Sequence, residues 1–392
     1  MKLRILTALG MALMAGALVL QYRPDTWERR VTDELMHAPS NHWARPTLEP
    51  GTGHFGDLVE ADWSALRTLE ENWGSIPGDV RFECLKATSD LDLQHHFATP
   101  CRQWLEAARR HLPTVERAVA APEAGPPERF DPLRGADSGF AARLMVLGRL
   151  PALEALSREA AGEHDRALDA CATTLEVIRD LEWGLRSTSD SLGERAGTLT
   201  FYPCAHALLN ATPERRAKFS EQLAKIAAGR PPPAHGFELN RSTELLHFFG
   251  PTLPKKTLAR ADPKVSGWIE RNADRLNPKA LQQTWDDLSR HEDEQVELAR
   301  QPSDRWPATN EALAAWKSVD ALFEGLAVMT SLANQTAEHD AWPDPLPQGK
   351  QVKLAREGDA VTVLLDLRTH PVQLKDGTTG DLPNRWTLTL PQ

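Results

Sequence analysis

Residues 162–178 read GEHDRALDACATTLEVI, and this stretch decides the fold class. Its apolar positions Leu168, Cys171, Leu175 and Ile178 recur at intervals of three, four and three residues. Such a period places all four side chains on one stripe of an amphipathic helix. We therefore expect a helix that buries this stripe and exposes the charged residues between its members.

The beginning of the stretch predicts a turn into that helix. Gly162 permits a tight turn, and Ala167 is small enough for close helix packing, so GEHDRAL resembles the turn of a tetratricopeptide hairpin. The match occurs once and no clean repeat period follows it, so the sequence predicts a helical hairpin without naming a repeat family. Pro151 is expected to kink or divide the segment before Gly162.

Helical patterns extend in both directions from this hairpin. Thr212 followed by Pro213 predicts a helix start, with a hydroxyl cap and a proline in the first turn, and Gly229 predicts its end. Two further stripes have helical spacing, one within residues 57–73 and one within 310–336. Their members are Trp63, Leu66, Leu69 and Trp73 in the first, and Trp316, Val319, Phe323, Leu326 and Met329 in the second.

The pattern changes after Trp342. Residues 350–355 and 360–367 flank Glu357-Gly358-Asp359 and predict a β-hairpin. Trp386, Leu388 and Leu390 alternate with threonines, as in a half-buried strand. The predicted fold is therefore mainly α, with a multi-helix body of helical-hairpin or solenoid-like type, an N-terminal membrane-anchor helix and a small C-terminal β-rich cap. The predicted parts are 1–22 (signal peptide or signal anchor), 23–56 (juxtamembrane helix and Pro/Gly linker), 57–125 (N-terminal helical subdomain), 126–340 (main helical domain) and 341–392 (β-rich cap).

The N-terminus predicts export. Lys2 and Arg4 precede residues 5–20, which carry no charge, and basic residues ahead of an apolar run place the bulk of the chain outside the cytoplasm. Residues 18–20 continue the apolar run, which favours a retained membrane anchor with the bulk facing the periplasm. Cleavage after Ala17, giving a secreted protein, is the alternative, and a buried helix of a cytosolic protein is a third reading.

The four cysteines gain meaning in an oxidising compartment. Cys84 and Cys101, like Cys171 and Cys204, are close in the chain, and these two pairings are favoured among the three possible ones. Four buried thiols are the alternative. A zinc site built from the cysteines is disfavoured, because no Cys-x-x-Cys occurs and the spacings are irregular.

Composition and motifs predict no catalytic, cofactor-binding or metal site. A net charge of −10 disfavours a nucleic-acid partner. The G-x-G-x-x-G of residues 51–56 follows a proline-rich segment rather than a strand, so a linker is favoured over a dinucleotide loop. His95-His96 and the acidic run at His291 lack the spacing of metal ligands. Cys204 and His206 diverge on a helix, which disfavours a catalytic pair.

The order of parts resembles a diffuse group of uncharacterised bacterial envelope proteins with a signal anchor, a helical body and a short C-terminal β segment. That segment opens on Trp342-Pro343-Asp344-Pro345, with Gly349 soon after, and is similar to the tail of type II secretion pseudopilins. Leu346 stands in place of the family's aromatic residue, and the acidic loop survives only as Asp376-Gly377. Because of these departures, the resemblance does not predict calcium ligands in this chain.

The sequence favours an exported, non-catalytic helical scaffold or protein-interaction protein of the bacterial cell envelope. Its expected partners are the membrane, through the N-terminal helix, and other envelope proteins. One alternative is an envelope hydrolase with a site assembled from distant residues. Another is an accessory subunit for secretion or pilus assembly, suggested by the pseudopilin-like tail.

Overall fold

The described part of the chain is mainly helical, with a small antiparallel sheet near the C-terminus, as the sequence predicts. Nearly all of it belongs to one compact unit, formed by residues 41–240 and 293–392. The predicted anchor and linker, residues 1–56, lie outside the described residues. Within the described ranges, no helix combines the length and hydropathy needed to cross a membrane. The computed structural model describes residues 63–85, 99–121, 138–184, 190–238, 290–291, 293–306, 310–339, 341–367, 371–373, 379–381 and 384–389.

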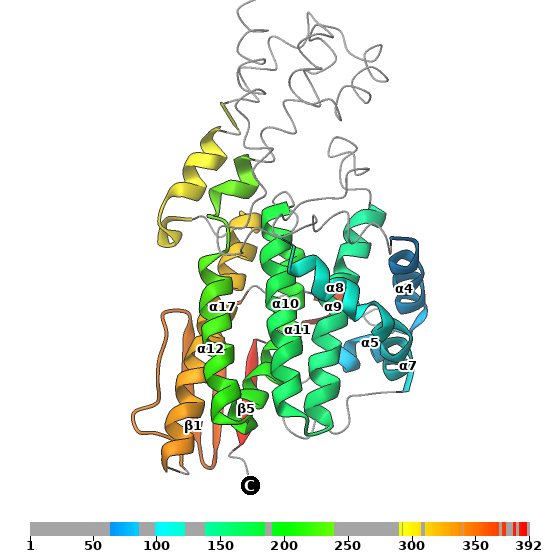
Figure 1. The fold of residues 1–392 in the computed structure, drawn as a ribbon. Helices are drawn as coiled ribbons and strands as arrows, with labels where there is room; N and C mark the ends of the chain where they lie inside the picture. The colour runs from blue at the N-terminus through cyan, green and yellow to red at the C-terminus, as the bar shows by residue number, and fades with distance from the viewer. Residues whose placement is uncertain are drawn as a thin grey trace, which may run out of the picture. The chain divides into compact units, whose positions relative to one another are not determined.

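Three long helices form the centre of this unit (Figure 1). They are α9 (Ser138–Ala160), α10 (His164–Gly184) and α11 (Asp190–Asn210), and each packs against the other two. The predicted stripe of α10 is fully buried between them. Gly162 has a φ of +72°, a left-handed conformation that glycine adopts without strain, and it makes the turn from α9 to α10. Of the two outcomes expected at Pro151, a kink or a division, the division is wrong, because α9 continues through that residue.

Three N-terminal helices, α4, α7 and α8, pack on this centre. α4 (Trp63–Ser75) buries Leu66, Leu69 and Trp73, three members of its predicted stripe, and α5 (Gly78–Leu85) follows it. Further along the chain, α7 (Thr99–Ala108), η2 (Arg109–His111) and α8 (Leu112–Val119) follow one another without a break. The indole of Trp104 donates a hydrogen bond of 2.8 Å to the carbonyl of Leu69, which joins α7 to α4.

Two capped helices complete the body. α12 (Pro213–Ala228) begins at Thr212, whose hydroxyl accepts from the backbone N–H of Arg215, and it ends at Gly229 as predicted. α17 (Glu311–His339) begins where the Asn310 side chain accepts from the backbone N–H of Leu313. α17 packs along α11 and buries its predicted stripe, except for Trp316, which is half-buried.

The C-terminal sheet packs against α17 and α11. Its antiparallel strands lie in the order β1 (Val352–Glu357), β2 (Ala360–Leu365), β5 (Arg385–Thr389), and a separate pair is formed by β3 (Pro371–Gln373) and β4 (Thr379–Asp381). Gly358, with a φ of +66°, makes the predicted hairpin turn. In β5, Trp386 and Leu388 are buried as the alternation predicts, and the Trp386 ring lies 4.6 Å from the ring of Phe201 on α11.

Gly325 lets α17 approach both neighbours closely. A Cβ atom added there would lie 2.8 Å from Leu365 Cδ2 and 2.8 Å from Phe201 Cε2. We expect Gly325→Ala to lower the free energy of unfolding by about 1–3 kcal/mol, because overpacking forces side chains to shift. Urea denaturation measures the change. Gly74→Ala is the matched control, since its Cβ meets nothing within 4 Å in α4 and is expected to be neutral or stabilising. Equal losses in both variants would contradict the close approach.

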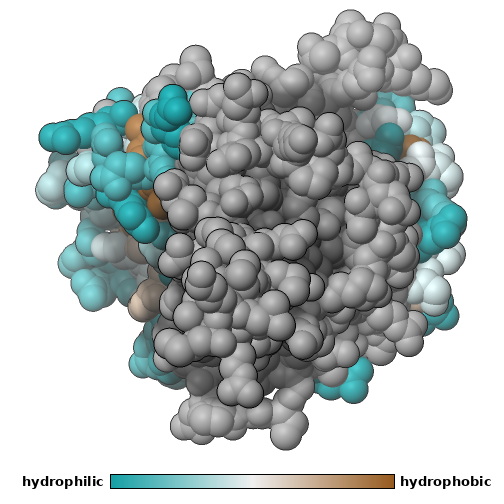
Figure 2. Space-filling model, turned by 90° about the horizontal axis from the view of Figure 1, so that it is seen from above, coloured by the Kyte–Doolittle hydropathy of each residue, from teal (hydrophilic) through white to brown (hydrophobic). Residues whose placement is uncertain are grey.

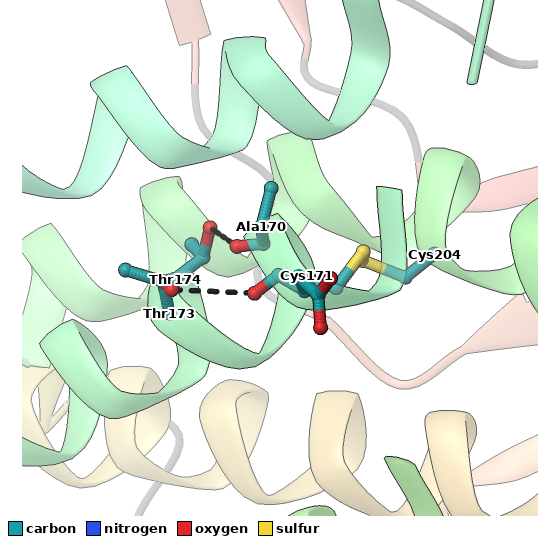
Figure 3. The surroundings of a disulfide bond; sticks show 6 residues. Ala170, Cys171, Thr173, Thr174 and Cys204 are labelled. Atoms are coloured by element: carbon teal, nitrogen blue, oxygen red, sulfur yellow. Dashed lines mark hydrogen bonds between the residues drawn. A yellow bond between two sulfur atoms is a disulfide. The ribbon is translucent and has the colours of Figure 1, made fainter. Parts of the chain in front are cut away.

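Two disulfides join helices within the body. The structure pairs Cys84 with Cys101 and Cys171 with Cys204, the pairing favoured by proximity in the chain, and leaves no cysteine free. All four are fully buried. Figure 3 shows the second bond, which links α10 to α11. Nearby, the hydroxyl of Thr174 donates to the carbonyl of Ala170 one turn earlier, so this part of α10 satisfies its polar side chains locally.

Candidate functional site

Three helices bring a carboxylate and two imidazoles together at one end of the body. Glu159 lies in the last turn of α9, His164 is the first residue of α10, and His206 lies one turn before the end of α11. The tight turn at Gly162 brings Glu159 and His164, which are five positions apart in the chain, close together. The packing of α11 on α9 and α10 supplies the third.

The geometry of the site centres on one oxygen atom. Glu159 Oε1 lies 2.8 Å from His164 Nδ1 and makes a second, short contact with His206 Nδ1. The Glu159 side chain is fully buried, whereas the side chains of His164 and His206 are 29% and 18% exposed. The other oxygen, Glu159 Oε2, is buried and has no hydrogen-bond partner among the residues that the structure describes. The site therefore has a buried, half-satisfied carboxylate beneath two imidazoles that reach solvent.

Two opposing effects act on the pKa of Glu159. Burial raises it and is the largest single cause, but the hydrogen bonds from His164 and His206 lower it, and the net result is a pKa below its usual value. The carboxylate is therefore ionised at neutral pH despite its burial. Within the part of the chain that the structure describes, its ion-pair partners are these two histidines and no arginine or lysine.

Neighbouring contacts hold the two histidines in place. Asn210, one turn further along α11, donates to the backbone carbonyl of His206 at 2.9 Å, and its Nδ2 lies 3.4 Å from His206 Nδ1. Asp165, next to His164, accepts from both the backbone N–H and the hydroxyl of Thr212. The two hydrogen bonds between Asp165 and Thr212 join the start of α10 to the junction of α11 and α12. The imidazoles are thus carried by helix ends that are themselves tied together.

A row of charged residues lies on α9 beside the site. Glu154 accepts from both Arg109 and Arg158, and Arg158 also pairs with Glu163 in the turn. The hydrogen bond that Arg158 donates to Glu163 is the largest cause that raises the pKa of the Arg158 guanidinium. Arg158 thus forms its ion pairs with Glu154 and Glu163.

The structure places the residues that the sequence singled out in different ways. Cys204 turns to Cys171 in a disulfide and His206 turns to Glu159, so the two diverge as expected for a helix. His291 is exposed in the short described segment 290–291. The G-x-G-x-x-G at 51–56 and His95-His96 lie outside the described residues.

Sequence reasoning missed this cluster. In the sequence, His164 belongs only to the turn motif that starts at Gly162, and Glu159 belongs to no motif. The one local signal is the spacing of Glu159 and His164 across Gly162, and nothing in the sequence connects that pair with His206, which lies 47 residues after Glu159.

Comparisons with known proteins give no family or fold neighbour: no family model, no curated protein and no solved structure matches the chain. The chemistry of the site is therefore inferred from the atoms of Glu159, His164 and His206 themselves. Two imidazole nitrogens and one carboxylate oxygen, one ligand atom from each residue, lie within 4.8 Å of one another. Such a set can bind a metal ion, or its hydrogen bonds can simply join the three helices to one another.

Proposed function

We propose that the protein is an exported helical scaffold of the bacterial cell envelope, which holds or positions other envelope proteins and is not itself a catalyst. The observation that carries this proposal is the pair of disulfides in the core of the helical body. Disulfides form and persist in oxidising compartments, so the pair indicates an extracellular or periplasmic location. The predicted N-terminal anchor or signal peptide, residues 1–22, would direct the export of the chain across the cytoplasmic membrane.

The contacts between helices favour a structural role for the body. Buried charged side chains are used to join one helix to another: Arg149 of α9 contacts Glu70 of α4, and Arg230, just after α12, contacts Glu182 of α10. Figure 2 shows a mostly hydrophilic described surface on the face it presents, with scattered hydrophobic residues. Leu364, on the outward side of β2, is the large apolar side chain exposed among the described residues. A rigid body with a polar surface suits reversible contacts with partner proteins.

In this proposal the uncharged segment at residues 5–20 tethers the body to the membrane and the helical hairpins face the periplasm. Cleavage after Ala17 would release the same body as a secreted protein. Both versions leave the disulfides in the same oxidising compartment.

Membrane fractionation with protease treatment of spheroplasts tests the proposed localisation. A membrane-bound chain that added protease digests supports the anchored form, and a soluble periplasmic chain supports cleavage near Ala17. Mass spectrometry of the non-reduced chain is expected to show the pairs Cys84–Cys101 and Cys171–Cys204. A protected, cytosolic chain with four free thiols would overturn the proposal.

A second candidate function, an envelope hydrolase, is favoured by the convergence of Glu159, His164 and His206 from three helices. A site assembled in this way is invisible to motif searches. A chain carrying Glu159→Gln separates the two candidates in a deletion strain. The readout is whether the variant complements the growth or envelope defect of the deletion strain. A variant that folds, is exported and complements the defect favours the scaffold. A variant that folds and is exported but does not complement it favours the hydrolase.

A further inference from the structure

We propose that Glu159, His164 and His206 bind one divalent transition-metal ion, and that this ion is Zn²⁺. This inference goes beyond the scaffold proposal and does not depend on export. It starts from the chemistry of the donors. Neutral imidazole nitrogen and carboxylate oxygen are the ligands of zinc sites with two histidines and one glutamate. Ca²⁺ and Mg²⁺ prefer shells made entirely of oxygen, so this set is poorly suited to them.

The spacing of the donors fits one ion. The three ligand atoms lie within 4.8 Å of one another, and a tetrahedral shell with zinc–ligand bonds of about 2 Å places its ligand atoms about 3.3 Å apart. His164 and Glu159 are closer than this, at 2.8 Å, so the imidazoles must open slightly to admit the ion. Both imidazoles are partly exposed, and small rotations of their rings are therefore available.

The buried carboxylate gives the second, independent argument. The Glu159 side chain is fully buried, and among the described residues only its Oε1 has hydrogen-bond partners. An ionised carboxylate removed from water carries a large desolvation cost unless a full opposite charge faces it. A bound Zn²⁺ supplies that charge, and the unpartnered Oε2 offers a second oxygen to the ion.

The partly exposed imidazoles lie between the buried carboxylate and solvent, so an ion can enter from the surface. Three protein ligands leave a fourth position of the tetrahedral shell for a water molecule. Since the ligands come from α9, α10 and α11, the bound ion links all three central helices.

Zinc titration of the full-length chain tests the site. The chain is purified without a polyhistidine tag, with both disulfides intact, treated with EDTA and desalted, and then titrated with ZnCl₂ by calorimetry. We expect one Zn²⁺ per chain and no binding of Ca²⁺. Glu159→Gln, His164→Gln and His206→Gln are each expected to weaken zinc binding by about tenfold or more. His339→Gln is the matched control, because it removes an exposed imidazole at the end of α17 and is expected to bind as the unaltered chain does.

A measurement on the unaltered chain avoids any dependence on how well the variants fold. Diethyl pyrocarbonate modifies accessible histidines, and peptide mass spectrometry reports each one. Zn²⁺ is expected to slow modification of His164 and His206 and to leave that of His339 unchanged. The proposal is overturned if Zn²⁺ does not bind, if His164→Gln and His206→Gln bind it as tightly as His339→Gln, or if Zn²⁺ protects neither histidine of the site.

Discussion

Replacing Arg230 by methionine is expected to lower the free energy of unfolding by about 3–5 kcal/mol. The guanidinium of Arg230 donates to both carboxylate oxygens of Glu182, at 2.8 and 2.7 Å, and the two side chains are 5% and 1% exposed. Arg230 also lies over the rings of Trp316 and Phe323 on α17. Without it, the carboxylate of Glu182 stays buried without its main counter-charge.

Urea denaturation of the disulfide-intact chain measures this loss, and two further variants interpret it. Arg385→Met removes one partner of the exposed pair Arg385–Glu357, which is about half exposed on each side, and its effect is expected to fall within the ~0–1 kcal/mol of surface pairs. The double change Arg230→Met with Glu182→Met removes both buried charges and is expected to recover most of the stability. A single Arg230→Met variant that unfolds like Arg385→Met would contradict the importance of the buried pair.

Removing the disulfide between α10 and α11 is the second large change. Its cysteines are 33 residues apart, and cross-linking a loop of that size lowers the entropy of the unfolded chain by an amount that corresponds to about 4 kcal/mol. The double variant Cys171→Ala with Cys204→Ala is expected to lose about 2–5 kcal/mol, because it also leaves small cavities at two fully buried positions.

The same urea denaturation, with a thiol assay to verify the remaining disulfide, checks this expectation. Cys84→Ala with Cys101→Ala is the comparison, since it removes the shorter loop, with a separation of 17 residues, and leaves α10 and α11 linked. Both double variants should be less stable than the unaltered chain. An unchanged urea midpoint for the variant of Cys171 and Cys204 would mean that helix packing alone fixes α10 against α11.

Much of the fold could be predicted because its signals are local. The stripe of α10, the cap at Thr212 and the hairpin turn at Gly358 each depend on residues a few positions apart, and all three are present in the structure. At Pro151 the local signal allowed a division of the helix that the structure does not contain. The proline ring removes one backbone hydrogen bond, but α9 is buried among α4, α10 and α11 along this stretch, and that packing outweighs the local cost.

The candidate site could not be predicted from local signals. His206 and Glu159 meet only because α11 packs on α9, and the chain gives no pattern that encodes this contact over 47 residues. Cysteines are different, because closeness in the chain already favours a pairing. The sequence therefore carries information about the covalent links of the body, whereas for the polar cluster it offers only the spacing of Glu159 and His164 across Gly162.

The two disulfides close two separate loops of the chain. One loop encloses residues 84–101 and the other encloses 171–204, and no disulfide connects the segment before residue 101 to the segment after residue 171. A single peptide-bond cleavage inside either loop leaves one covalent molecule. A cleavage between residues 101 and 171 gives two fragments with no covalent link. When the cleavage falls between α8 and α9, the contacts that hold the fragments together include the packing of α4 and α7 on α9 and of α8 on α10.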